Sequence, residues 1–256
     1  MQGQIKTEGA RPARKRADAD SGRRPLKISE TIAHEILRDI VDQGLTSGDR
    51  LPREADMLVQ YGISRSSLRE ALRLLEVQGL IRIRPGPGGG PVVGDADDRG
   101  LSRTLRLYLH MMGTPYEELL QAWRVTDPLL AELAALNPDR ERVKQTMAPY
   151  VNPVPGGDVA REGTDFHVAV ADLAGNEVLS LMFRAMTATM EPAIVSAVRM
   201  QNFDDEIVHD HGDIARAIVE GKAARAHKLM KEHVEHIIGH FEEFLPHTIG
   251  GKVALG

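Results

Sequence analysis

Apolar residues along the chain repeat mainly with the spacing of α-helices. Isoleucines recur every four residues over 28–40, which predicts a helix that ends at Gly44. A short second helix follows over 54–61, and a third begins after Ser64, a suitable N-cap, and runs to Gly79. The pattern therefore predicts three helices within the first 80 residues.

The third predicted helix has two chemically different faces. At about 100° per residue, Arg65, Arg69 and Arg73 fall within about an 80° arc, and leucines occupy the opposite side. The next residues alternate apolar and basic ("LIRIR"), turn ("PGPGGG") and return ("PVV"), as two short strands would. Glycine-rich turns can also bind nucleotide phosphates, but no Gly-Lys-Ser/Thr follows here. Three helices and a two-stranded wing are typical of a winged helix-turn-helix, whose third helix enters the DNA major groove.

Beyond residue 100 the pattern is helical, and strand signals are scarce. A proline- and glycine-rich stretch, "APYVNPVPGGD", predicts a loop that neither neighbouring helix continues through. The sequence thus predicts a mainly α fold, with an N-terminal winged helix-turn-helix followed by an all-α bundle of six or seven helices. The expected bundle helices cover 101–112, a segment started by Thr114 and Pro115, another after Pro138, and 159–173, 177–199, 204–220 and 222–245.

Charge also divides the chain. Residues 1–94 hold 16 basic and 12 acidic side chains, whereas the rest is acidic overall and holds nine of the ten histidines. Only the first part is therefore expected to meet a polyanion. The predicted organisation is a flexible basic arm (1–25), a DNA-binding domain (26–94), a linker (95–100), a helical effector-binding and dimerisation domain (101–248) and a flexible tail (249–256). The arm either touches DNA phosphate or only aids solubility.

Composition excludes some classes of protein. The chain has no cysteine, so a disulfide framework and a thiolate metal site are both excluded. No apolar run approaches about 18 residues, and no signal-peptide core is present. We therefore expect a cytoplasmic protein without a membrane partner.

The first predicted domain resembles a known family. The stretch "GDRLPREADMLVQYGISRSSLREALRLLEVQGLIRIRPGPGGG" is similar to the DNA-binding domain of the GntR family of bacterial transcription regulators. The family usually has Glu-Arg after Leu-Pro, whereas this chain has Glu54-Ala55, so Arg53 is the candidate replacement. The resemblance implies operator contacts from Ser64, Arg65, Ser66 and Arg69, and an approach to DNA by Gly86 at the tip of the wing.

The second half resembles the FCD ligand-sensing domain of the FadR-type branch of this family. The resemblance rests on "AWRVTDPLLAELAA", "DFHVAVADLAGN" and "HDHGDIARAIVEGKAARAHKLMKEHV". It implies that His167, His211 and His233 bind a divalent metal, and neutral imidazoles suit Zn or Ni. The alternative is that these histidines are hydrogen-bonded polar groups lining a cavity.

The resemblance also implies a fourth ligand, an Asp four residues before the first histidine. Gly163 occupies that position. Glu162 is one residue out of register and Asp165 points to another helix face. The site would then hold three histidines alone, or be completed by Glu162 or by a bound anion.

Other polar residues of this half have two possible roles. By the same resemblance, Arg124 and Asp127 reach the effector pocket, where the planar Arg fork suits a carboxylate; otherwise they form an intrahelical surface pair. His236 and His240 share one helix face with His233, which without the resemblance would indicate a surface stripe.

Taken together, the sequence predicts a ligand-responsive transcription regulator rather than an enzyme. A homodimer would bind a pseudo-palindromic operator, as repressor or activator, under the control of a small carboxylate in the metal-containing pocket. One alternative is a metal-dependent hydrolase using the histidine cluster, although no His-Glu-x-x-His motif is present. Another is a DNA-binding protein without a small-molecule effector, which would leave the long acidic half without a role.

Overall fold

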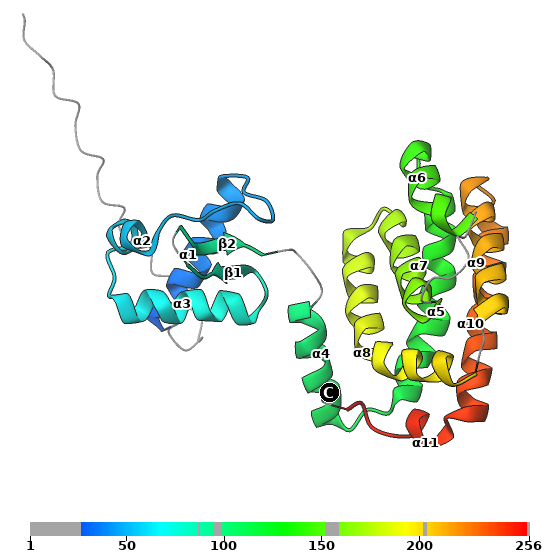
Figure 1. The fold of residues 1–256 in the computed structure, drawn as a ribbon. Helices are drawn as coiled ribbons and strands as arrows, with labels where there is room; N and C mark the ends of the chain where they lie inside the picture. The colour runs from blue at the N-terminus through cyan, green and yellow to red at the C-terminus, as the bar shows by residue number, and fades with distance from the viewer. Residues whose placement is uncertain (1–26, 87, 95–98, 152–158, 202–203, 255–256) are drawn as a thin grey trace, which may run out of the picture.

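The computed structural model describes residues 27–86, 88–94, 99–151, 159–201 and 204–254 (Figure 1). The described buried apolar side chains form two separate hydrophobic clusters, one in each half of the chain. The N-terminal half contains three helices and a two-stranded antiparallel sheet: α1 (Ile28–Asp42), α2 (Glu54–Tyr61), α3 (Arg65–Val77), β1 (Ile81–Arg84) and β2 (Gly90–Val93).

The core of the N-terminal domain lies mainly between α1 and α3. Ile36 of α1 and Leu68 and Leu75 of α3 are almost completely buried, as the helical spacing requires. Full burial of one such side chain contributes about 1.5–3 kcal/mol. This packing fixes α3 on the domain and leaves its opposite face open to solvent.

The wing pairs β1 with β2 from Ile81 opposite Val93 to Arg84 opposite Gly90. Its turn depends on glycine. Gly86 has a φ of +93°, a backbone conformation that residues with a side chain rarely adopt. A Cβ on Gly89 would lie 2.1 Å from the carbonyl oxygen of Arg84, so no larger residue fits without moving the backbone.

The C-terminal half is a helical bundle built around α5. This helix packs most extensively against α10 and also contacts α7, α8 and α9. Its buried face includes Leu120, Trp123 and Leu130. The helices of the described bundle are α4 (Arg99–Met112), α5 (Tyr116–Ala135), α6 (Arg140–Val151), α7 (Val159–Leu173), α8 (Glu177–Gln201), α9 (Asp204–Val219), α10 (Ala223–Phe244) and the short α11 (Pro246–Ile249).

The predicted mainly α fold, a winged helix-turn-helix followed by a helical bundle, is confirmed. Two boundaries differ. Helix α4 begins at Arg99, so the expected linker over 95–100 ends earlier. Helix α6 continues through Pro149, where the sequence predicts a loop. The proline lies in the last turn and removes a single backbone hydrogen bond, and the ring of Tyr150 packs edge-on against Phe166, which holds this turn in place.

The C-terminal residues described do not form the flexible tail expected over 249–256. Val253 is fully buried, and its amide donates to the carbonyl of Thr114 (3.0 Å). Its carbonyl lies 2.7 Å from Nδ1 of His110, and the amide of Tyr116 donates to Gly251 (3.1 Å). The segment is thus attached to the junction of α4 and α5, because one buried valine and several backbone hydrogen bonds offset its loss of chain entropy.

Two expectations lie outside the described residues: the basic arm over 1–25 and most of the linker. Of the helices that are described, none is both long enough and apolar enough to cross a membrane.

Candidate functional site

The exposed face of α3 carries the arginines that the sequence singled out. Arg65, Arg69 and Arg73 are exposed, whereas Leu68 and Leu72 on the other side are buried. Nε of Arg69 lies 3.6 Å from a carboxylate oxygen of Glu54 on α2. Both side chains are exposed, so this ion pair contributes little to stability. The helix therefore offers a cationic surface on a rigid support.

The N-terminus of α3 is held by serine side chains. The hydroxyl oxygen of Ser64 accepts a hydrogen bond from the amide of Ser67 (3.2 Å), which confirms the predicted N-cap. The hydroxyl of exposed Ser66 is 2.9 Å from that of Ser64. Ser64 therefore has a structural role whether or not it also meets DNA.

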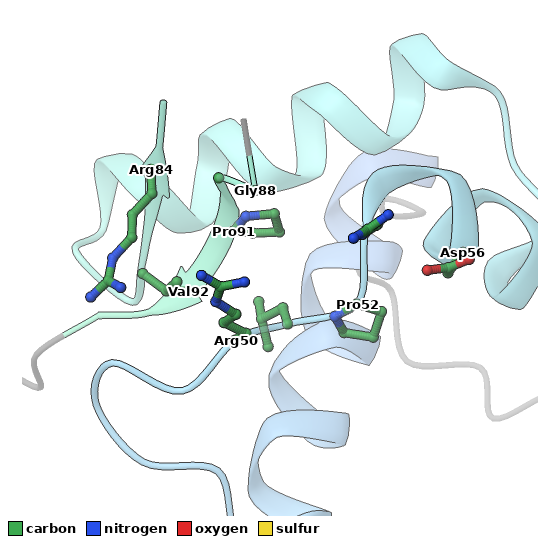
Figure 2. A pocket seen from close by; sticks show the side chains of 11 residues that line it. Arg50, Pro52, Asp56, Arg84, Gly88, Pro91 and Val92 are labelled. Carbon is green, nitrogen blue, oxygen red and sulfur yellow. The ribbon is translucent and has the colours of Figure 1, made fainter. Parts of the chain in front are cut away.

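A cleft lies between the wing and the segment that enters α2 (Figure 2). It has a volume of about 240 Å³ and is lined by Arg50, Arg53, Arg84 and Asp56, together with wing glycines. All four charged side chains are exposed. Of these arginines, the sequence motifs select only Arg53. Arg50 and Arg84 line one cleft because the segment of Arg50 pairs with the wing, through an isolated bridge between Arg50 and Val92 of β2. Sequence motifs do not show this pairing.

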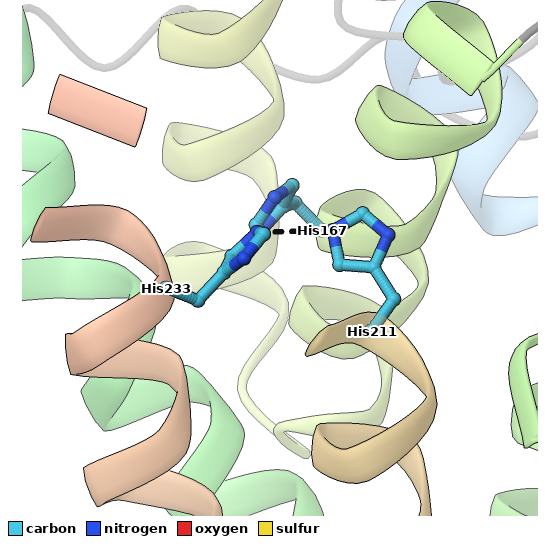
Figure 3. Close-up of side chains that lie close together, drawn as sticks. All are labelled: His167, His211 and His233. Atoms are coloured by element: carbon cyan, nitrogen blue, oxygen red, sulfur yellow. Dashed lines mark hydrogen bonds between the residues drawn. The ribbon is translucent and has the colours of Figure 1, made fainter. Parts of the chain in front are cut away.

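Inside the C-terminal bundle, three histidines from three helices point toward one another. Figure 3 shows His167 of α7, His211 of α9 and His233 of α10. One ring nitrogen from each lies within 4.8 Å of the other two, and all three residues are buried. The structure thus brings together the residues that the family resemblance selected, although they are 66 positions apart in the sequence from first to last.

The rings are oriented by carboxylates. Nδ1 of His233 lies 3.1 Å from Oδ2 of Asp210, which accepts its proton, so Nε2 presents a lone pair to the cluster. That Nε2 is 3.0 Å from Nε2 of His211. Two nitrogens that bind one ion at about 2.0–2.1 Å lie roughly 3 Å apart, so this spacing fits two ligands of one metal.

Asp127 supplies the carboxylate beside His167. Its side chain is fully buried, and Oδ2 lies 2.6 Å from Nδ1 of His167 and accepts a hydrogen bond from Nε1 of Trp123 (2.9 Å). Oδ1 is buried and has no hydrogen-bond partner within the described part of the chain. A buried carboxylate oxygen without a partner is costly, and a cation would satisfy it. The three imidazoles are a donor set that fits a divalent metal, and this carboxylate lies beside one of them.

This geometry changes the expected source of a fourth ligand. Asp165 is exposed, so it does not replace the Asp that the family resemblance places at Gly163. The side chain of Glu162 lies outside the described residues. The carboxylate at the cluster comes instead from Asp127 on α5, because α5 packs against α7.

Arg124 does not share that location. Nε of Arg124 lies 3.0 Å from Oε2 of Glu235, and its side chain is 37% exposed. A second contact joins it to Glu242 at 3.9 Å. Both glutamates belong to α10, and at about 100° per residue they lie on the side of that helix opposite His233. Arg124 and Asp127 therefore form neither an intrahelical pair nor a shared contact in one pocket.

The remaining histidines lie outside the cluster. His209 is exposed whereas His211 is buried, as expected for residues two apart on a helix. His236 and His240 are half-buried, and their Nε2 atoms are 2.8 Å apart. Of the stripe on α10, only His233 joins the cluster.

Burial favours the neutral form of two imidazoles of the cluster, those of His211 and His233. It lowers the pKa of His211 well below the ordinary value for histidine, and the neighbouring His233 and His167 lower it further. Burial also lowers the pKa of His233, although the hydrogen bond to Asp210 opposes the shift. Neutral imidazole is the form that binds metals.

Comparisons with known proteins match family models to both halves of the chain. The sequence model for bacterial regulatory proteins of the gntR family matches residues 28–89, and that for the FCD domain matches 118–236. The chain is 28% identical over 241 residues to the Uxu operon transcriptional regulator of Escherichia coli (strain K12), covering 88% of this chain and 90% of that protein.

A second curated relative has a similar extent. The chain is 27% identical over 225 residues to a putative L-lactate dehydrogenase operon regulatory protein of the same strain, covering 83% of this chain and 86% of that one. A solved structure of a Streptococcus agalactiae GntR protein aligns with a TM-score of 0.60 at 21% identity, over 82% of this chain and 98% of that one. At this identity the structural match shows the fold alone.

The lowered pKa values of His211 and His233 predict a pH dependence of stability. In the unfolded chain these histidines bind protons near pH 6.5, whereas in the folded chain they bind them only at lower pH. Between these values the unfolded state holds more protons. The free energy of unfolding of chelator-treated protein is therefore retained above about pH 6.5. As the pH drops below that value, the free energy of unfolding decreases by up to about 1.4 kcal/mol per pH unit for each such proton.

Urea unfolding followed by the fluorescence of Trp123, the single tryptophan, measures this effect. His211→Gln is expected to reduce the pH slope. The matched control is His209→Gln, two residues away with its side chain 75% exposed, which should keep the wild-type slope. Equal slopes in wild type and His211→Gln would contradict the assignment.

Proposed function

The chain is a transcription regulator of the GntR family with an FCD ligand-binding domain, and from this premise we propose that it binds a pseudo-palindromic operator as a homodimer under the control of a small carboxylate. The carboxylate binds in the C-terminal bundle, beside a divalent metal. The observation that carries this proposal is the buried cluster of His167, His211 and His233 in a domain separate from the cationic recognition helix.

The chain is a regulator and not an enzyme, since the proteins similar to it are named as transcriptional regulators. A hydrolase built on the histidine cluster is therefore not proposed. Operator binding would place its action in the bacterial cytoplasm.

In the proposed complex, α3 enters the major groove. Arg65 and Arg69 project from its exposed face and can reach base edges, where an Arg fork suits guanine. Ser64 and Ser66, at the N-terminus of α3, lie where this helix would meet the backbone. Arg53 is the proposed contact from the start of α2, in place of the arginine that the family usually has at the position of Ala55.

The wing and a second subunit complete the proposed complex. Gly86 at the tip of the wing has no side chain and can come close to the DNA backbone. Two half-sites require two readers related by a two-fold axis. Helix α4 has an exposed apolar surface that a second copy could cover. This surface is formed by Leu107, Tyr108, Met111 and Met112.

Substitution of the α3 arginines tests the reading of DNA. Arg65→Ala and Arg69→Ala should each weaken operator binding by roughly 1–3 kcal/mol, because removing the guanidinium leaves the base edge unsatisfied. Gel-shift titrations at fixed salt measure the change. Arg225→Ala, an exposed change of equal charge on α10, is the control and should bind like wild type. Wild-type affinity in both α3 variants would remove this helix from the interface.

The metal of the proposed site would be held by His167, His211 and His233, with Asp127 as the carboxylate. Zn or Ni suits three imidazoles and one oxygen donor. When bound, such an ion supplies a positive centre with room for an effector carboxylate. The chain's own contribution is to favour the neutral form of His211 and His233 by burial and to orient His233 through Asp210.

Metal analysis of protein purified without a polyhistidine tag tests this site. We expect wild type to retain a stoichiometric divalent ion and His211→Ala to lose it, whereas His209→Ala keeps it. Asp127→Asn should weaken metal binding by about 10- to 100-fold, since a carboxylate that binds or orients a ligand is worth this much. Wild-type protein without stoichiometric metal would leave only the alternative of a hydrogen-bonded polar cavity.

Arg124 is the proposed second contact of the effector. It is held by Glu235 on the side of α10 away from His233, so an effector beside the metal would reach it only if the guanidinium left that glutamate and turned toward the cluster. The exchange would release an interhelical ion pair between α5 and α10 and would thereby link effector binding to the packing of the bundle. A coupling of typically about 1–3 kcal/mol would then reach DNA affinity.

Calorimetry with metal-loaded protein tests the role of Arg124. L-lactate is the first acid to titrate, since one similar protein is named for an L-lactate dehydrogenase operon, and other hydroxy- and dicarboxylic acids follow. We expect Arg124→Ala to weaken binding of the acid by about 10- to 100-fold, the value of a charge-assisted hydrogen bond. Glu235→Gln should strengthen binding, because it releases the guanidinium. Unchanged affinity in both variants would show that the pair only joins the two helices.

A further inference from the structure

The cleft beside the wing has more positive than negative side chains. Arg50, Arg53 and Arg84 line it together with one carboxylate, Asp56. None of the three arginines forms an ion pair with another described residue. Arg140, by contrast, donates to four backbone carbonyl groups within the bundle. An excess of exposed guanidinium groups around one cleft favours an anion as its occupant.

The backbone fixes the position of Arg50. The amide of Leu51 donates to Pro91 (3.0 Å), that of Gly48 donates to Val93 (3.0 Å), and that of Val93 donates to Asp49 (2.9 Å). Residues 48–51 are thus joined to β2 on the edge away from β1. Arg50 therefore extends from a segment bound to the sheet, and it lines the same cleft as Arg84 of β1 (Figure 2).

Glycines leave the wing side of the cleft open. Gly88, Gly89 and Gly90 line it without side chains, and Gly90 stands opposite Arg84 in the sheet. A bulky anion can therefore approach the backbone here without meeting a side chain. Gly89 cannot be enlarged, because its Cβ would overlap the carbonyl of Arg84.

The cleft is linked to the cationic face of α3 through α2. Arg53 precedes Glu54, whose carboxylate lies 3.6 Å from Arg69. The same polyanion can thus meet α3 and the cleft together, which favours a DNA phosphate over a free small anion. Three guanidinium groups against one carboxylate leave enough positive charge to neutralise a phosphodiester.

We propose that Arg50 and Arg84, with Arg53, bind a backbone phosphate of the operator between the wing and α2. This inference rests on the proposed DNA-binding function and adds residues that neither the sequence motifs nor the comparisons select. The contact positions the domain on DNA without reading bases.

Fluorescence anisotropy with the full-length chain tests the proposal. The probes are a duplex from a genomic fragment that the protein retains and a scrambled duplex of equal length, each titrated between about 50 and 200 mM salt. For Arg50→Ala and Arg84→Ala we expect weaker binding to both duplexes by a similar factor. The slope of log affinity against log salt should fall in magnitude by about 1 for each phosphate that the variant no longer neutralises.

Two further variants distinguish the effect of losing a positive charge from a structural effect of the substitution. Arg50→Lys keeps a positive charge and should recover most of the slope, whereas a merely structural role of the guanidinium would not be rescued. Arg225→Ala on α10 removes equal charge elsewhere and should leave the slope unchanged.

The outcomes distinguish this inference from the proposed function. A wild-type slope in both Arg50→Ala and Arg84→Ala would overturn the phosphate site while operator binding stands. Loss of the preference for the genomic duplex would overturn it too, because the arginines would then read bases. Absence of wild-type binding to any duplex would instead overturn the proposed function, and this inference with it.

Discussion

The burial of three imidazole rings at one point constrains the rest of the C-terminal domain. The rings are out of contact with water, and the polar groups nearest to their nitrogens come from other helices. The ring of His211 also stacks on Phe166, with centroids 4.1 Å apart. Helices α5, α7, α9 and α10 must therefore keep their relative positions for these contacts to persist. Any ligand of this cluster acts on four helices together.

Helix α5 contributes to this constraint by breaking a local rule. Pro128 lies in its interior directly after Asp127, where a missing amide and a clash with the preceding turn cost roughly 3 kcal/mol or more. Apolar side chains of α5 itself, among them Leu130 and Ala131, are almost fully buried in the bundle and can offset that cost. Departures from local preference are expected next to functional residues. The proline and the buried carboxylate are thus adjacent residues of α5 at the histidine cluster.

Described arginines lie in different environments, and three of these suit different roles. Arg140 is satisfied by backbone carbonyls and joins α6 to the end of α9. Arg124 is held by carboxylates of a neighbouring helix, an arrangement that a competing anion could change. Arg50 and Arg84 face a cleft and have no carboxylate partner among the described residues. The surroundings of each guanidinium, rather than the residue type, therefore separate structural from functional arginines.

The sequence by itself determined the elements and most of the residues of interest. Helical periodicity, the cap at Ser64 and the alternation in "LIRIR" are local patterns, and they predicted the winged helix-turn-helix and the bundle because neighbouring residues decide them. The three histidines came from resemblance to a family, not from spacing, since they lie on three helices.

Only the tertiary structure decided which distant segments contact one another. It placed Asp127 at the histidines and Arg124 on the other side of α10, although the two are three residues apart. It joined the segment of Arg50 to the wing, and it buried Val253 where a flexible tail was expected. Local sequence cannot encode these contacts, because each depends on packing between elements whose relative positions are set by the whole core.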